Sequence, residues 1–435
     1  MRLALLLWIW LGLSASAEDL RFPAPEFRSG YTFPATTAPA ATSDAREWMD
    51  LAVFAGALSL ASWLAVRRRS RRGVFWLMLF SLAYFGFYKQ GCVCPIGSTQ
   101  NVAMALVNPH YAVPITVTLL FVLPLIFALF FGRVFCSSVC ALGAIQDLVI
   151  LKPIQLPRRV TTALSMIPYV YLGLAALFAI VNTAFIICRF DPFVGFFRLG
   201  GNAPYLFLGA AFLVVGMFVA RPYCRFFCPY GALLGLMSRF SRWHVAITPT
   251  NCVNCRLCEV SCPFDHIEKP NILAKREARP RGIRRIGQLM VMTPVIIALG
   301  AWVGHEMANP LSRANRTVWL AEQMVVEKAN PSLKPSLDTE AFRAAGTSLD
   351  DLLAESQKIR SQMRLGGTAL GGILGLIFGL KLIGVSTQRT RADYEIDKAG
   401  CFSCARCCSY CPNDASHAKS SAPAAESGKE KAVCA

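Results

Sequence analysis

The sequence predicts a mainly α-helical protein that crosses a membrane several times. Of its 435 residues, 54% are hydrophobic and only 16% are charged, and the mean hydropathy is +0.45. This balance is typical of integral membrane proteins. The formal charge of +18 is explained by basic residues that collect in cytoplasmic loops. We therefore expect membrane lipid, and no nucleic acid, as a partner of this chain.

The N-terminus has the pattern of a secretory signal peptide over residues 1–17. Arg2 precedes an apolar stretch, and Ala15-Ser16-Ala17 has the small residues of a cleavage site. The alternative interpretation is an uncleaved first helix, and either one places residue 18 onward outside the cytoplasm. A Pro- and Ala-rich linker is expected over 18–46.

Seven apolar stretches after the signal are long enough to serve as membrane spans. They lie at about 48–66, 74–88, 115–131, 163–187, 205–220, 286–303 and 365–383. The arginine-rich stretch at 67–72 places the end of the first span in the cytoplasm. Five spans then form a membrane domain over 47–247, and the last two occupy 286–304 and 365–384.

The charges of two loops set the remaining orientation. Residues 221–285 carry 12 Arg or Lys against 4 Asp or Glu, whereas 305–362 carry 7 against 8. Because cytoplasmic loops are enriched in basic residues, the first loop is expected inside and a segment over 305–364 outside. Residues 248–285 and 385–415 then share the cytoplasmic side.

Two cysteine runs on that side match C-x2-C-x2-C-x3-C-P, the bacterial spacing for [4Fe–4S] clusters. The first run is Cys252, Cys255, Cys258 and Cys262, and the second is Cys401, Cys404, Cys407 and Cys411. Each iron of such a cluster needs a thiolate ligand. We therefore predict two [4Fe–4S] clusters in a split, α+β, ferredoxin-like module whose halves are 248–285 and 385–415. The alternative interpretation is two structural zinc sites.

The predicted ligand sets cross between the two runs, because the last cysteine of such a run usually reaches the other cluster. One cluster is expected on Cys252, Cys255, Cys258 and Cys411, and the other on Cys401, Cys404, Cys407 and Cys262. Residues 263–400 separate the runs in the sequence. The two runs must therefore fold together, which their placement on one side of the membrane permits.

A second cysteine pattern, C-x3-C-x2-G-A, occurs twice, each time after a span that runs inward. It contains Cys136 and Cys140 in the first copy and Cys224 and Cys228 in the second. Cysteines four residues apart share one face of a helix. The two pairs could thus supply four thiolates to a further metal or redox centre near the inner face. The alternative interpretation is that they are apolar packing thiols.

Three more cysteines, Cys92, Cys94 and Cys188, are expected at the outer face. They are candidates for another metal centre or for a disulfide in that oxidising space. On the seventh span, glycines recur every fourth residue from Gly367 to Gly379, and we expect this face to serve internal packing rather than a dimer seam. The tail over 416–435 is small and polar and is expected to be disordered.

At these cysteine motifs the chain resembles the NosR/NirI and NapH family of membrane polyferredoxins. The segments that carry the resemblance are 132–136, 224–229 and the two ferredoxin runs, so it covers about 91–412. The resemblance implies a bacterial inner-membrane protein. It also implies electron transfer between the membrane or cytoplasm and extracytoplasmic reductases, or a role in the maturation of those enzymes.

Two features depart from the family pattern. The NosR branch carries a large flavin-binding domain before its spans, whereas residues 18–46 are too few for a domain. The stretch 344–351 holds no convincing flavin-attachment motif, so we expect no flavin in this chain. Ala141 also stands where the family usually has a proline after Cys140.

Two functions are therefore expected, in order of preference. The first is an electron-transfer subunit, rather than a stand-alone enzyme. It would take electrons from a cytoplasmic donor or quinol and pass them to an extracytoplasmic flavoprotein or reductase. The second is an assembly factor or regulator of an extracytoplasmic metalloenzyme, such as a copper enzyme.

Overall fold

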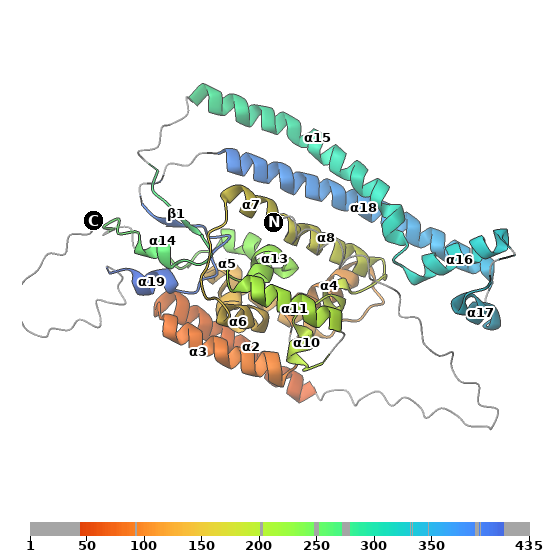
Figure 1. The fold of residues 1–435 in the computed structure, drawn as a ribbon, viewed down its shortest axis with the longest axis horizontal. Helices are drawn as coiled ribbons and strands as arrows, with labels where there is room; N and C mark the ends of the chain where they lie inside the picture. The colour runs from red at the N-terminus through yellow and green to blue at the C-terminus, as the bar shows by residue number, and fades with distance from the viewer. Residues whose placement is uncertain are drawn as a thin grey trace, which may run out of the picture.

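The computed structural model describes residues 44–412, except 92–93, 201–202, 248–251, 272–278, 331, 333, 347, 388–390 and 392. The described part is mainly helical and contains one two-stranded sheet (Figure 1). The expected signal peptide, almost all of the linker, Cys92 and the tail lie outside the described residues, so those predictions stay open.

The first half of the chain forms a bundle of short and long helices around one apolar core. The helices before the first cysteine repeat are α2 (Asp44–Ser62), η1 (Trp63–Arg67), α3 (Arg71–Ser81), η2 (Leu82–Tyr88), α4 (Pro95–Val107) and α5 (Ile115–Phe131). Those from the repeat onward are η3 (Phe135–Val139), α6 (Ala141–Leu148), α7 (Arg158–Leu164), α8 (Ile167–Ile180), α9 (Ile186–Arg189), α10 (Val194–Phe197), α11 (Ala203–Gly216), α12 (Pro222–Phe226) and α13 (Pro229–Arg239). The cysteines of both C-x3-C repeats belong to the core of this bundle.

The second half contains two long helices and the segments that carry the cysteine runs. Its elements are α14 (Leu257–Ser261), β1 (Ile267–Glu268), α15 (Arg279–Ser312), α16 (Arg316–Ala329), α17 (Leu337–Ala344), α18 (Leu349–Ser386), β2 (Glu395–Ile396) and α19 (Arg406–Tyr410). β1 follows the first run and pairs antiparallel with β2, which precedes the second run. α14 packs beside α19, so the two runs meet at one edge of the molecule (Figure 1).

Among the described residues, four helices are long and apolar enough to cross a membrane. They are Ala45–Arg67, Arg158–Ile180, Pro280–Ser312 and Leu349–Ser386. They coincide with the first, fourth, sixth and seventh expected spans. α15 and α18 extend well beyond the predicted limits 286–304 and 365–384 because their charged end turns continue the helix past the apolar part.

The other three expected spans are not confirmed. α5 and α11 are apolar but shorter, and the second expected span, which lies in α3 and η2, is not among the four long apolar helices. At 17 residues, α5 is about 26 Å long, less than the hydrocarbon thickness of about 30 Å. α5 ends at Phe131, and the next residue, Gly132, has a φ of 78°, which suits glycine and stops the helix.

α15 and α18 run side by side (Figure 1) and meet through glycines. A methyl group on Gly371 would collide with the carbonyl oxygen of Gly300, and one on Gly367 would lie 2.7 Å from the carbonyl oxygen of Gly304. Small residues allow two helix backbones to approach this closely. The prediction that the glycine face of α18 serves internal packing is thus confirmed.

Gly371→Ala should destabilise this helix pair, whereas Gly372→Ala should not. At Gly371 the new methyl group meets backbone, and separating the helices costs about 1–3 kcal/mol. At Gly372 the nearest atoms are side-chain carbons at 3.8 and 3.9 Å, and the helix propensity of alanine favours the variant by up to about 1 kcal/mol. Thermal unfolding in detergent, followed by circular dichroism, should show shifts of opposite sign. Equal shifts would contradict the close packing.

Candidate metal centres

The two cysteine runs adopt the same backbone conformation. Asn254 and Arg256 in the first run have φ of 53° and 60°, and Ser403 and Ala405 at the matching positions of the second have 52° and 56°. Non-glycine residues in this left-handed region cost on the order of 1–3 kcal/mol each. A short helix, α14 or α19, then begins one residue before the third cysteine. The shared strain indicates that both loops are shaped for the same kind of ligand.

A cavity lies inside the second run. Its empty volume, including the open mouth, is about 390 Å³. Cys401, Cys404 and Cys407 line it together with Cys262 of the first run. The backbone N–H of Ser403 donates to Cys401 Sγ at 3.4 Å, as expected of a loop that points amides at thiolates. The structure therefore brings together the four cysteines that the sequence predicts for one cluster.

The fourth cysteine of the second run lies with the first run. The Cys258 thiol interacts electrostatically with Cys255, Cys252 and Cys411. Burial raises the pKa of Cys258 to about 11, so the free thiol is protonated at neutral pH and binding of iron would release its proton. These four cysteines are the other predicted ligand set.

The C-x3-C repeats differ in one respect from the expected geometry. Cys140 and Cys228 have extended backbone conformations and stand at the N-caps of α6 and α13, so a helix break separates each pair. Pro229 is the first residue of α13, a position that proline favours because its missing N–H would have no partner within the helix there. The expectation that each pair shares one helix face is therefore wrong.

The four thiols of the repeats nevertheless converge in the core of the bundle. They are 6–8% exposed, and Cys140 interacts electrostatically with Cys224, Cys136 and Cys228. The Nε2 of Gln146 lies 3.2 Å from Cys224 Sγ, and the N–H of Gly231 donates to Cys228 Sγ at 3.3 Å. These donors suit thiolates better than neutral packing thiols.

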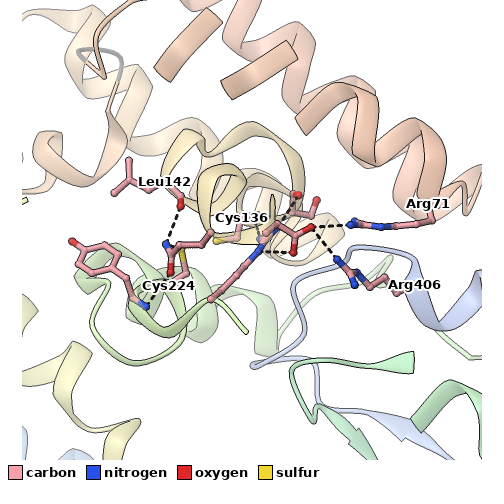
Figure 2. A network of polar contacts seen from close by, with 10 residues as sticks. Arg71, Cys136, Leu142, Cys224 and Arg406 are labelled. Atoms are coloured by element: carbon pink, nitrogen blue, oxygen red, sulfur yellow. Dashed lines mark hydrogen bonds and ion pairs between the residues drawn. The ribbon is translucent and has the colours of Figure 1, made fainter. Parts of the chain in front are cut away.

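A buried ion network connects the repeats with the second cysteine run (Figure 2). Asp147 Oδ1 lies 3.2 Å from Arg221 Nε, and its Oδ2 lies 2.8 Å from Arg71 Nη2 and 3.1 Å from Arg406 Nη2. Arg221 is fully buried, and its guanidinium also donates to the carbonyl oxygens of Cys136 and Ser137. Asp147 thus ties the first repeat to the second repeat, to α3 and to the second run.

Our sequence analysis missed this network, although the sequence contained a signal for it. Arg133 stands three residues before Cys136, and Arg221 stands three residues before Cys224. The repeated pattern is therefore R-x2-C-x3-C-x2-G-A. Asp147 had no comparable signal, because nothing in its local sequence shows that three guanidinium groups surround it.

Arg133 is a buried cation without a carboxylate partner among the described residues. It is 7% exposed, and its guanidinium lies 3.9 Å from Cys136 Sγ and 4.5 Å from the ring centroid of Phe402. Its Nε has no hydrogen-bond partner. An unpaired buried charge is costly, so an anionic group beside Cys136 would balance it. A thiolate-bound cluster is such a group.

Zinc stays the alternative ligand of the two runs. In the described part of the chain, no three His, Cys, Asp or Glu side chains are arranged to hold a single metal ion.

Two of the expected outer cysteines lie near each other. Cys94 interacts electrostatically with Asp191 and Cys188, and a methyl group on Gly97 would lie 3.1 Å from Cys188 Sγ. Both are free thiols in this structure. The third, Cys92, is outside the described residues.

Comparison with known proteins agrees with this picture. The family described as "4Fe-4S binding domain" matches the chain twice, at residues 113–159 and 202–248. Each match contains one C-x3-C repeat. Long apolar helices and a duplicated [4Fe–4S] binding domain define the chain as a membrane iron–sulfur protein.

Several known proteins are similar to this chain in sequence. The uncharacterized protein MJ0750 of Methanocaldococcus jannaschii is 30% identical over 192 residues, which cover 42% of this chain and 77% of that protein. YccM of Escherichia coli, named an electron transport protein, is 27% identical over 187 residues, 39% of this chain and 52% of YccM. The regulatory protein NosR of Pseudomonas aeruginosa is 26% identical over 210 residues, 44% of this chain and 29% of NosR.

The chain belongs to the NosR/NirI-like family of membrane iron–sulfur ferredoxins. Its match spans about half the length of YccM and less than a third of NosR. No solved structure matches the chain.

Proposed function

We propose that this protein is an electron-transfer subunit of the bacterial inner membrane. The observation that carries the proposal is the cavity that Cys262 shares with Cys401, Cys404 and Cys407. Four thiols around one cavity suit one [4Fe–4S] cluster. The name of the relative YccM, an electron transport protein, supports the same function.

The second cluster would be held by Cys252, Cys255 and Cys258 with Cys411. The electrostatic contact between Cys258 and Cys411 supports this set. A third centre would be held by the cysteines of the repeats, which the family match and the unpaired charge of Arg133 support. When bound, [4Fe–4S] clusters take up and release single electrons.

Aromatic and cationic side chains fill the space between the second run and the repeats. The ring centroids of Phe264 and Phe402 are 4.7 Å apart, and both rings line the cavity. The guanidinium of Arg221 lies 5.6 Å from each ring centroid, while Arg133 contacts Phe402. These groups exclude water between the two sites, and their positive charge stabilises an added electron on either side in a low-dielectric interior.

The proposed orientation places both runs in the cytoplasm and α16 and α17 outside it. The excess of basic residues in 221–285 and the neutral balance of 305–362 support it. Electrons would enter from a cytoplasmic donor or from quinol. They would leave to an extracytoplasmic flavoprotein or reductase, since this chain is not proposed to hold flavin.

A second candidate function is regulation or assembly of an extracytoplasmic metalloenzyme. The neighbouring thiols of Cys94 and Cys188 favour it, because soft thiolate ligands suit copper(I). The relative NosR is named a regulatory protein. Copper bound at these two thiols by a protein without redox-active iron would support this function over electron transfer.

Anaerobic purification with iron and sulfide analysis and EPR tests the proposal. About eight irons per chain are expected for the two ferredoxin runs, and about twelve if the repeats hold a third [4Fe–4S] cluster. Dithionite should reduce them and produce EPR signals. A protein purified under these conditions with zinc in place of iron would refute the electron-transfer function.

A further inference from the structure

The two C-x3-C repeats exchange their arginines. Arg221 of the second copy reaches the turn of the first, where a methyl group on Gly143 would lie 3.3 Å from its Nη1. Arg133 of the first copy reaches the turn of the second, where a methyl group on Gly231 would lie 3.1 Å from its Nη2. Each guanidinium thus occupies the space that the glycine of the opposite copy leaves free, and the two arginines hold equivalent positions.

The surroundings of the two arginines differ at one position of the repeat. Asp147 stands seven residues after Cys140 and lies 3.2 Å from Arg221. The matching residue of the second copy, seven residues after Cys228, is Gly235. One arginine therefore has a carboxylate partner from the opposite copy, and the other meets a glycine where that carboxylate would be.

A backbone carbonyl takes the place of the missing carboxylate. Arg133 Nη1 lies 3.5 Å from the carbonyl oxygen of Ala399, and a methyl group on Gly235 would lie 3.3 Å from the same oxygen. A side chain at position 235 would therefore begin close to the guanidinium of Arg133. A neutral carbonyl at the limit of hydrogen-bond distance leaves the charge of that guanidinium uncompensated.

This uncompensated charge lies beside the thiols of the repeats. Arg133 Nη2 is 3.9 Å from Cys136 Sγ, and Cys224 and Cys228 also interact electrostatically with Arg133. Because Arg133 is only 7% exposed, salt and water screen its charge little. Three of the four thiols predicted for the third centre thus lie near one unpaired cation.

We propose that Arg133 raises the reduction potential of the metal centre on the C-x3-C repeats, and that Gly235 leaves its charge unpaired for this purpose. This inference rests on the third centre of the proposed function. Net charge and contacts to the sulfurs set the potential of an iron–sulfur centre. Reduction adds one negative charge, which a cation beside a ligand sulfur stabilises in a low-dielectric interior.

The consequence is a direction for electron transfer within the chain. One electron would pass from the cluster of the second run, which is oxidised, to the centre on the repeats, which is reduced. No bond forms or breaks in this step. Arg221, which lies between the two sites, contributes less to the difference because Asp147 pairs with it.

A redox titration of the full-length protein, purified anaerobically in detergent and followed by EPR, tests this role. The signals of the two runs are assigned with Cys262→Ser and Cys411→Ser, so the remaining signal belongs to the repeats. Arg133→Gln should lower the equilibrium constant for reduction of that centre about tenfold or more, which is about 59 mV for one electron. Arg133→Lys keeps the charge and should restore the potential toward that of wild type.

A second pair of variants leaves Arg133 in place. Gly235→Asp and Gly235→Asn add side chains of nearly equal volume, so their effects on packing against Ala399 are matched. Only the aspartate supplies the carboxylate that the first copy has. Gly235→Asp should therefore lower the equilibrium constant for reduction about tenfold relative to Gly235→Asn. Iron analysis and thermal unfolding show which variants keep their centres and their fold.

The possible results separate this inference from the proposed function. Equal potentials in wild type and Arg133→Gln, with full iron, would overturn the role of Arg133 and leave electron transfer intact. A shift confined to the second run, whose Phe402 also contacts Arg133, would overturn it too, as would a wild-type protein with only about eight irons. Wild-type protein without redox-active iron would refute the proposed function itself. If Arg133→Gln loses iron, the two Gly235 variants decide, and equal potentials in both overturn the inference.

Discussion

Asp147→Asn is expected to be among the most destabilising single substitutions in this protein. It leaves the guanidinium groups of Arg71, Arg221 and Arg406 without their shared carboxylate, and Arg221 is fully buried. Removing one partner of a buried ion pair typically costs about 3–5 kcal/mol. Thermal unfolding in detergent should show a large drop in the midpoint.

The matched control for this prediction is Glu322→Gln. Glu322 also pairs with two arginines, Arg313 and Arg360, but at a partly exposed site, where such pairs contribute about 0–1 kcal/mol. Arg406→Gln combined with Asp147→Asn should cost less than the sum of the two single substitutions, because both disrupt the same pair. A midpoint for Asp147→Asn equal to that of Glu322→Gln would contradict the structural role of the network.

The network should also make stability depend on pH. Burial alone would raise the pKa of Asp147, but Arg221, Arg406 and Arg71 outweigh it and hold the pKa well below its usual value. A carboxylate with a lowered folded-state pKa stabilises the protein above its unfolded pKa of about 4, and this contribution is lost as pH falls. Asp147→Asn should therefore reduce the loss of stability on acidification.

Cys262→Ser and Cys411→Ser should each disturb the cluster of the opposite run. Because Cys262 lines the cavity with Cys401, Cys404 and Cys407, its loss should alter or remove the cluster of the second run. Loss of Cys411, which interacts electrostatically with Cys258, should affect the cluster of the first run. EPR of the two variants, purified anaerobically, should show different residual signals and up to about four fewer irons per chain.

The two variants serve as controls for each other, and Cys408→Ala adds a third. Cys408 is buried in the same short helix as Cys407 but belongs to neither predicted set. Its removal should preserve both clusters. If Cys262→Ser removed the same signal as loss of Cys258, each run would serve its own cluster and the crossed ligation would be wrong.

Local sequence was a good guide to the long helices and a poor one to the short ones. The spans within α15 and α18 follow from continuous apolar residues, whereas the full length of both helices did not, because turns beyond the apolar part extend them. The breaks before α6 and α13 were not foreseen, because a spacing of four residues suggests one continuous helix. Pro229 was the signal that the chain starts a new helix there.

The sequence by itself determined the chemistry of this protein. Cysteine spacing indicates iron–sulfur ligation, and the length of the apolar stretches indicates a membrane protein. An arginine three residues before each C-x3-C pair is also visible in the sequence. These signals are local, since each depends on residues within one turn, loop or span.

Only the tertiary structure decided how these parts are joined. It brings Cys262 into the cavity of the second cysteine run. It surrounds Asp147 with three arginines from distant segments. It also buries residues of the second run whose counterparts in the first run are exposed. The two runs have the same cysteine spacing and nearly the same backbone, so their spacing could not tell them apart. Their difference arises from long-range packing against Arg133, Arg221 and Asp147, and such packing depends on the whole fold.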